Sequence, residues 1–199
     1  MPGEHHPQPT VDRSGSATTA RPLRRQAGRQ AAEVLFILLL AAAIHAGWSG
    51  GLIDPRGVCL VVVAVAVAKT SYFLVENLQH ILLATSHEIP YHRFLGLMGV
   101  NMSQITLSFA LDFWLLEMAE QGSFTGFDPA AMTPSRVFFD CLFYSVLNFS
   151  FFGFGEILPR TIPAKVVTLL EVVLAFFTVI FLLSDFISLK NSLRGDRGR

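Results

Sequence analysis

Four long runs of apolar residues dominate the sequence and limit what the chain can fold into. They cover approximately residues 31–48, 57–75, 94–117 and 163–189. Each is close to the roughly 20 residues that a helix needs to cross the hydrocarbon core of a bilayer. With 52% hydrophobic and 15% charged residues and a mean hydropathy of +0.50, the chain has too little polar surface for an ordinary soluble domain. The sequence therefore predicts an all-α membrane protein with four transmembrane helices.

The segments outside these runs predict a disordered tail and an orientation. Residues 1–30 lack hydrophobic periodicity and end in a basic stretch from Arg21 to Arg29, and residues 190–199 are also basic. Because positive charge favours the cytoplasmic side, we expect both termini in the cytoplasm, with a bacterial inner membrane as the location. A secretory signal is the alternative for the first run, and it leaves the other three crossings in the same orientation.

A fifth apolar stretch, residues 137–152, is too short to span the membrane and runs directly into a glycine-rich turn. Irregular backbone at membrane depth is tolerated only where protein or a water-filled cavity satisfies its polar groups. The stretch therefore predicts a re-entrant element that lines a pore.

The residues around this turn resemble the pore of two-transmembrane potassium channels, in which a short pore helix leads into T-x-G-Y-G-D, a proline and the inner helix. Here the hexapeptide is Phe-Phe-Gly-Phe-Gly-Glu at residues 151–156, and Pro159 takes the place of the proline. The resemblance covers roughly residues 94–189. It implies that residues 94–117 are the outer helix, 137–149 the pore helix and 163–189 the inner helix, while residues 31–93 add two further helices and a cytoplasmic loop.

The resemblance implies a passive cation channel that assembles as a homotetramer in the lipid bilayer. A dehydrated cation, expected to be K⁺, exchanges its water shell for backbone carbonyls from four subunits, so the ion is cargo and no cofactor is expected. Glycine permits the backbone angles that this requires. The filter residues implied are Phe151, Phe152, Gly153, Phe154 and Gly155. Glu156 implies a ring of carboxylates at the outer mouth that concentrates cations.

Three aromatic residues depart from the family pattern. Phe151 stands where the family has a threonine whose hydroxyl forms the innermost cation site. Phe154 replaces a tyrosine and removes its phenolic hydrogen bond, and Phe152 adds bulk behind the filter. Three readings therefore stay open: a potassium channel, a weakly selective cation channel, and a non-conducting scaffold or accessory subunit with the same fold.

Two positions in the expected inner helix are gating candidates. Glu171 matches an acidic position found in related pore sequences, and Ala175 stands where a hinge glycine is common. Alanine makes a helix stiffer than glycine does, so a bend at this position is harder.

Two opposite charges lie inside apolar runs. Lys69 falls in the second run and Asp112 in the third. An ionisable group at this depth is costly unless it is paired or hydrated. Either the two side chains form an intramembrane ion pair, or Lys69 extends along its stem to the cytoplasmic interface.

Other functions are disfavoured by what the sequence lacks. It has no regularly spaced arginines for a voltage sensor, no internal repeat for a secondary transporter, and no catalytic or phosphate-binding motif for an enzyme. A formal net charge of +0 argues against nucleic acid as a partner. The two cysteines, Cys59 and Cys141, lie in apolar surroundings. The histidines of the internal loop are either pH sensors or solvated side chains: His80, His87 and His92.

Overall fold

The structure is a computed structural model. It describes the backbone of residues 20–84, 91–127, 133–153 and 155–195, and the side chains of residues 32–75, 96, 98–127, 133–153 and 155–184. The chain divides into two compact units, residues 1–39 and 40–199. The first unit holds the beginning of helix α1 (Ala20–Ser49), and the second holds every other element.

Helix α1 begins earlier than predicted. Residues 20–30, expected to be a disordered tail, form its first turns, because alanine, arginine, glutamine and leucine dominate this stretch and all are strong helix formers. Residues 1–19 of that tail lie outside the described residues. The helix ends in a Schellman motif, in which Leu52 N donates to Gly47 O and Gly51 N donates to Trp48 O. Gly51 supplies the left-handed residue that this motif requires, with φ +72°.

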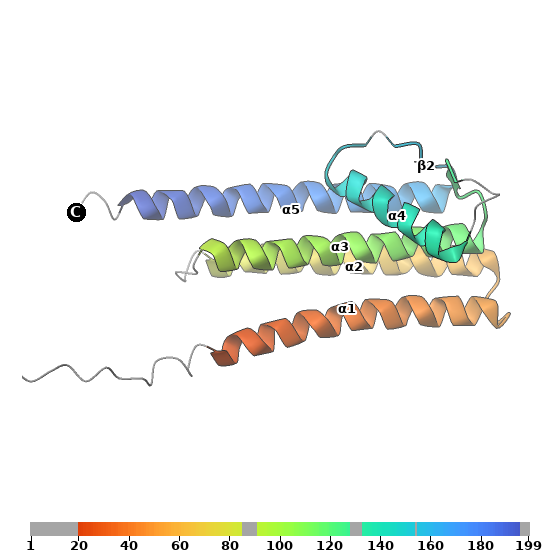
Figure 1. Cartoon of the computed structure of the whole chain (residues 1–199), viewed down its shortest axis with the longest axis horizontal. Coiled ribbons are helices and arrows are strands. Elements are labelled where there is room, and N and C mark those ends of the chain that lie inside the picture. Colours follow the sequence, from red (N-terminus) through yellow and green to blue (C-terminus); the bar gives the residue numbers. More distant parts are fainter. Residues whose placement is uncertain (1–19, 85–90, 128–132, 154, 196–199) are drawn as a thin grey trace, which may run out of the picture. The chain divides into compact units, whose positions relative to one another are not determined.

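The second unit confirms the predicted all-helical fold. Its helices are α2 (Pro55–Ala84), α3 (Tyr91–Ala119), α4 (Pro134–Phe149) and α5 (Ile162–Gly195). Figure 1 shows α2, α3 and α5 running side by side, with the short α4 crossing near α3 and α5. α3 and α5 each contact the other three of these helices.

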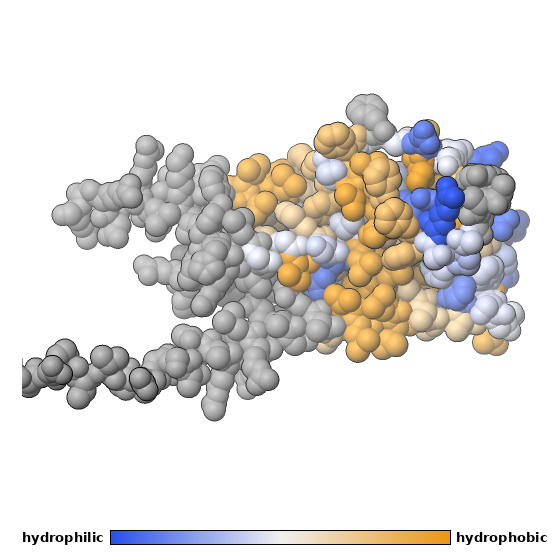
Figure 2. Space-filling view, in the orientation of Figure 1, coloured by the Kyte–Doolittle hydropathy of each residue, from blue (hydrophilic) through white to orange (hydrophobic). Residues whose placement is uncertain are grey.

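Three described helices are long and apolar enough to cross a membrane: Ala32–Ser49 of α1, Pro55–Val75 of α2 and Ile162–Ser184 of α5. α3, predicted as a fourth crossing, is not among them, because polar residues interrupt its middle. Four of these are buried, namely Gln104, Thr106, Ser108 and Asp112. A crossing by α3 therefore stays a prediction. Figure 2 shows hydrophobic side chains over much of the described surface, with hydrophilic ones gathered near the end where α3 stops and α5 begins.

An aromatic cluster packs the short helix α4 against α3. Phe113 of α3 is fully buried, and its ring meets those of Phe124 and Tyr144 edge-on, with centroids 5.4 and 5.1 Å away. Phe124 and Tyr144 also contact each other at 5.6 Å. Edge-to-face pairs of this kind add stability beyond the area they bury. The cluster joins α3, α4 and the loop between them.

The segment after the glycine-rich turn is tied back to the end of α3. Strand β1 (Phe124–Thr125) pairs antiparallel with β2 (Leu158–Pro159). Glu117, at the end of α3, accepts hydrogen bonds from the backbone N–H groups of Gly122 at 2.8 Å and Phe124 at 3.0 Å. Gly126 has φ +96°, and a Cβ there would collide with the backbone carbonyl of Glu156. This close approach requires glycine at position 126.

Gly126→Ala tests whether this anchor is needed, with Gly122→Ala as its matched control. Both positions have positive φ, so each alanine costs about 1–2 kcal/mol from backbone strain. Only Gly126 faces neighbouring backbone, which adds roughly 1–3 kcal/mol of overpacking. Unfolding of the purified protein in detergent should therefore show Gly126→Ala as clearly the less stable variant. Equal stabilities would mean that the backbone near the β1–β2 pair shifts at little cost to make room for the added methyl group.

Candidate functional site

Helix α4 and the loop after it enter the helix bundle and leave it at the same end. α4 begins near the end of α3, where Trp114 Nε1 donates to Pro134 O at 3.2 Å. Farther along, Ser145 Oγ donates to Thr106 O at 2.9 Å. Thr106 precedes the last residue of α3, Ala119, by 13 residues (119 − 106), which is about 20 Å of helix. β2 then pairs with β1, just beyond α3. The segment therefore has the re-entrant course that the sequence predicts.

Phe151 terminates α4 in a strained conformation. Phe152 N donates to Leu147 O at 2.9 Å and Phe151 N donates to Asn148 O at 3.1 Å, the same Schellman pattern that ends α1. Phe151 occupies the left-handed position with φ +57°, where α1 has Gly51. A residue with a Cβ is unfavourable there. The position that the family gives to an ion-coordinating threonine is thus a helix cap in this chain.

The remaining predicted filter residues form a short loop between α4 and β2. Phe152 is 73% exposed, Gly153 is exposed with φ +44°, and Gly155 is half-buried against Leu147. Glu156 is exposed. Phe154 lies outside the described residues. Whether the carbonyls of residues 151–155 bind a cation stays a prediction, because a ring of such groups needs more than one chain.

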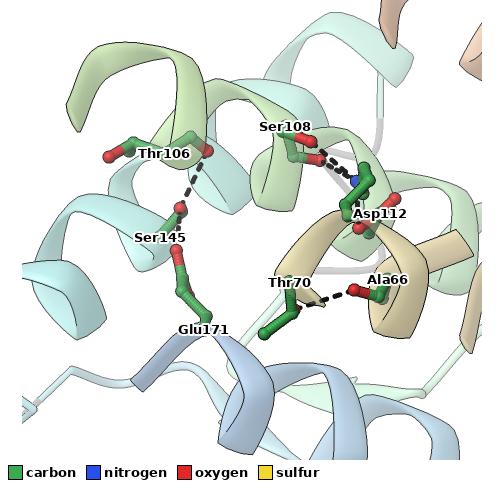
Figure 3. Close-up of polar contacts among 8 residues, drawn as sticks. Ala66, Thr70, Thr106, Ser108, Asp112, Ser145 and Glu171 are labelled. Carbon is green, nitrogen blue, oxygen red and sulfur yellow. Dashed lines mark hydrogen bonds and ion pairs between the residues drawn. The ribbon is translucent and has the colours of Figure 1, made fainter. Parts of the chain in front are cut away.

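A buried polar network connects α4 to α5 directly behind this loop. Glu171 of α5 has 0% exposure, and its carboxyl group contacts Ser145 Oγ and accepts a hydrogen bond from Asn148 Nδ2 at 3.2 Å. One turn before Asn148 on α4, Tyr144 Oη lies 3.2 Å from Thr168 Oγ1 of α5. Figure 3 shows Ser145 between Thr106 and Glu171, so the network reaches three helices. Glu171, chosen from the sequence as a gating candidate, is therefore positioned by α4.

The second gating candidate, Ala175, is fully buried in α5, one turn beyond Glu171. α5 is helical through this position. A role in bending stays a prediction.

Lys69 and Asp112 lie together between α2 and α3. Lys69 Nζ is 2.5 Å from Asp112 Oδ2, and it also donates to Ser108 Oγ at 2.7 Å and Ser108 O at 3.2 Å. The ring of Phe109 lies 5.4 Å from the ammonium group. Both charged side chains are largely shielded, at 13% and 5% exposure. Lys69 therefore reaches across to Asp112 and Ser108 of α3.

Several residues of the site were not predicted from the sequence. Ser145 and Asn148 stand three apart in an apolar stretch, a spacing that puts both on one helix face and is a usable signal. Glu117 and Gly126 carry no such signal, because their partners are backbone atoms of other segments.

Other expectations concern metals, thiols and histidines. Among the residues that the structure describes, no group of three His, Cys, Asp or Glu side chains is placed to hold a metal ion. Cys59 and Cys141 are both buried free thiols. The side chains of the loop histidines His80, His87 and His92 lie outside the described residues.

Replacing Phe151 should reveal its strain. Phe151→Gly removes the left-handed penalty, whereas Phe152→Gly, at a neighbouring exposed phenylalanine without positive φ, removes none. Both glycines raise the entropy of the unfolded chain equally. In detergent, the free energy of unfolding should therefore be about 1–2 kcal/mol higher for Phe151→Gly than for Phe152→Gly. The reverse order would show that the cap is unstrained.

A double-mutant cycle tests the ion pair. Lys69→Met or Asp112→Leu alone leaves one buried charge without its partner and should cost about 3–5 kcal/mol. The two together remove both charges and should recover most of that loss. Stability to denaturation in detergent is the measurement. Additive losses in the double variant would contradict coupling between the two side chains.

Comparison with known proteins finds similarity to channels over part of the chain. Residues 103–190 match the sequence profile of the family described as "Ion channel", a family of channels and not of enzymes. The potassium channel protein kcv of Paramecium bursaria Chlorella virus 1 is 44% identical over 43 residues, which are 22% of this chain and 46% of the viral protein. The match thus spans less than half of that relative. No solved structure matches the chain significantly. Residues 103–190 are therefore similar to the ion channel family, and part of the chain is similar to a viral potassium channel protein.

Proposed function

We propose that the chain is one subunit of a passive, K⁺-conducting channel in which four copies surround a central pathway. The observation that carries this proposal is the re-entrant course of α4 and its glycine-rich loop beside the apolar helix α5. The order of helix, short helix, Gly-Phe-Gly and helix within residues 103–190 matches the family. In this proposal α3 is the outer helix and a fourth crossing, α4 the pore helix and α5 the inner helix.

Exposed apolar faces support assembly of several copies. On α5 five exposed apolar residues follow each other at alternating spacings of four and three, which places them on one helix face. They are Leu169, Val173, Phe176, Ile180 and Leu183. On α4 the exposed Phe139, Phe143 and Val146 follow the same spacing. The irregular backbone after α4 also needs protein or water around it at this depth, because lipid offers it no hydrogen bonds.

The mechanism follows from the chemistry of the loop. Backbone carbonyls of residues 151–155 from four copies replace the water shell of the cation, and Gly153 and Gly155 permit the necessary backbone angles. α4 points its C-terminal, partially negative end towards the loop, which favours a cation there. Glu156 repeats around the outer mouth and raises the local cation concentration. Transport is passive, and both termini are cytoplasmic in this orientation.

Phe151 favours a second candidate, a weakly selective cation channel. The phenylalanine provides no hydroxyl for an innermost cation site, and its backbone is used to end α4. With one coordinating ring fewer, discrimination between K⁺ and Na⁺ is weaker. A non-conducting scaffold with the same fold is the third candidate.

Flux from liposomes separates the three candidates. Purified protein, first verified as a tetramer by its mass in detergent, should release K⁺ faster than Na⁺. Equal release of the two ions would replace the first candidate with the second. A verified tetramer that releases neither would leave the scaffold.

Glu156→Gln provides a control for the outer mouth in the same assay. Removing four carboxylates should lower flux at low ionic strength and have little effect at high ionic strength, because salt screens exposed charges. Arg160→Gln, at another exposed charge of the same segment, changes the net charge in the opposite direction and should not lower flux.

A further inference from the structure

The hydroxyl of Ser145 has two hydrogen-bonding neighbours but only one proton. Ser145 Oγ lies 2.9 Å from Thr106 O and also contacts Glu171 Oε1. Thr106 O is a backbone carbonyl and can only accept. When the Ser145 proton goes to Thr106 O, no two unprotonated oxygens face each other at 2.9 Å. The hydrogen between Ser145 and Glu171 then comes from Glu171.

A neutral carboxyl group satisfies every contact at this position. Glu171 Oε1 donates to Ser145, and Oε2 accepts from Asn148 Nδ2 at 3.2 Å. An ionised carboxylate can only accept, and it would compete with Thr106 for the single Ser145 proton. The geometry of the three contacts thus favours the neutral carboxyl group.

Among the side chains that the structure describes, no cation pairs directly with Glu171. Its side chain has 0% exposure, and the charged groups that act on it are Asp112 of α3 and Lys69 of α2. Lys69 is already bonded to Asp112 and Ser108, so this pair is neutral as a unit. The titratable group facing Glu171 from α4 is Tyr144, which is hydrogen-bonded to Thr168. A buried carboxylate without a cationic partner is strongly disfavoured.

We propose that Glu171 is a neutral carboxylic acid that bridges α5 to α4, and that its loss of a proton releases the pore loop. The bridge runs from Glu171 through Ser145 to Thr106 and so joins α5, α4 and α3 (Figure 3). Asn148 extends it to the last turn of α4, three residues before Phe151. Glu171 is thus a positioning residue for the loop, and flux falls when it is deprotonated. This last consequence rests on the proposed channel function, whereas the protonation state does not.

Infrared spectroscopy tests the protonation state without any transport assay. A neutral carboxylic acid has a C=O stretching band that a carboxylate lacks. The reconstituted wild-type protein at neutral pH should show this band, and Glu171→Gln should lose it. Glu156→Gln, which changes an exposed glutamate, should keep it. An unchanged band in Glu171→Gln, or no band in the wild type, would overturn the proposal.

The pH profile of cation flux tests the switch. Glutamine keeps one N–H donor and one acceptor, so Glu171→Gln should conduct like the wild type at neutral pH and show no fall at alkaline pH. Wild-type flux should fall about tenfold once Glu171 is ionised, because a broken buried hydrogen bond shifts the population of the bridged state by that factor. Ser145→Ala should lower flux at every pH.

The outcomes of the two assays are distinguishable. Flux that declines equally in the wild type and Glu171→Gln would refute the switch. The infrared band without flux in any variant would refute the channel and leave the neutral acid in place.

Discussion

The structure depends on the polar side of helix α3. α3 supplies a partner to three neighbouring segments: Thr106 to α4, Asp112 to α2, and Glu117 to the loop that carries β1. A polar group surrounded by apolar residues is costly unless it is hydrogen-bonded, so each of these contacts specifies which element packs at which height along α3. The apolar faces of α2 and α5 alone would allow many rotations and shifts. The polar contacts of α3 select one arrangement of these helices.

The same contacts hold the loop at both of its ends. At the end that joins α4, Glu171 and Thr106 hold Ser145, one turn before α4 ends. At the end that joins β2, the β1–β2 pair and the close approach at Gly126 hold the segment that follows Glu156. A loop fixed at two points tolerates local strain, because relaxing it would break contacts elsewhere. This accounts for a phenylalanine in left-handed backbone at position 151.

The sequence was informative where physical constraints are local. Apolar length predicted helices that the structure has, and the short stretch before Gly153 predicted a re-entrant segment because neither its length nor its glycines suit a crossing. The pairing of Lys69 with Asp112 stood as one of two options, since opposite charges in two apolar runs do not say which faces meet. Glu117 and Gly126 act on backbone atoms that become neighbours only after folding. The early start of α1 follows from helix propensity, which the lack of hydrophobic periodicity in residues 20–30 conceals.

In the proposed channel, Phe151 links the fold to ion selectivity. A Schellman motif needs a left-handed residue, and a β-branched side chain such as threonine is less suited to that conformation than phenylalanine. A chain that ends its pore helix in this way at position 151 therefore cannot easily place a threonine there. Loss of the hydroxyl ring is then a consequence of how α4 ends, and it does not require a separate selection against potassium. Selectivity in such a pore would depend on the carbonyls that follow Phe151, whose spacing is set by the two anchored ends of the loop.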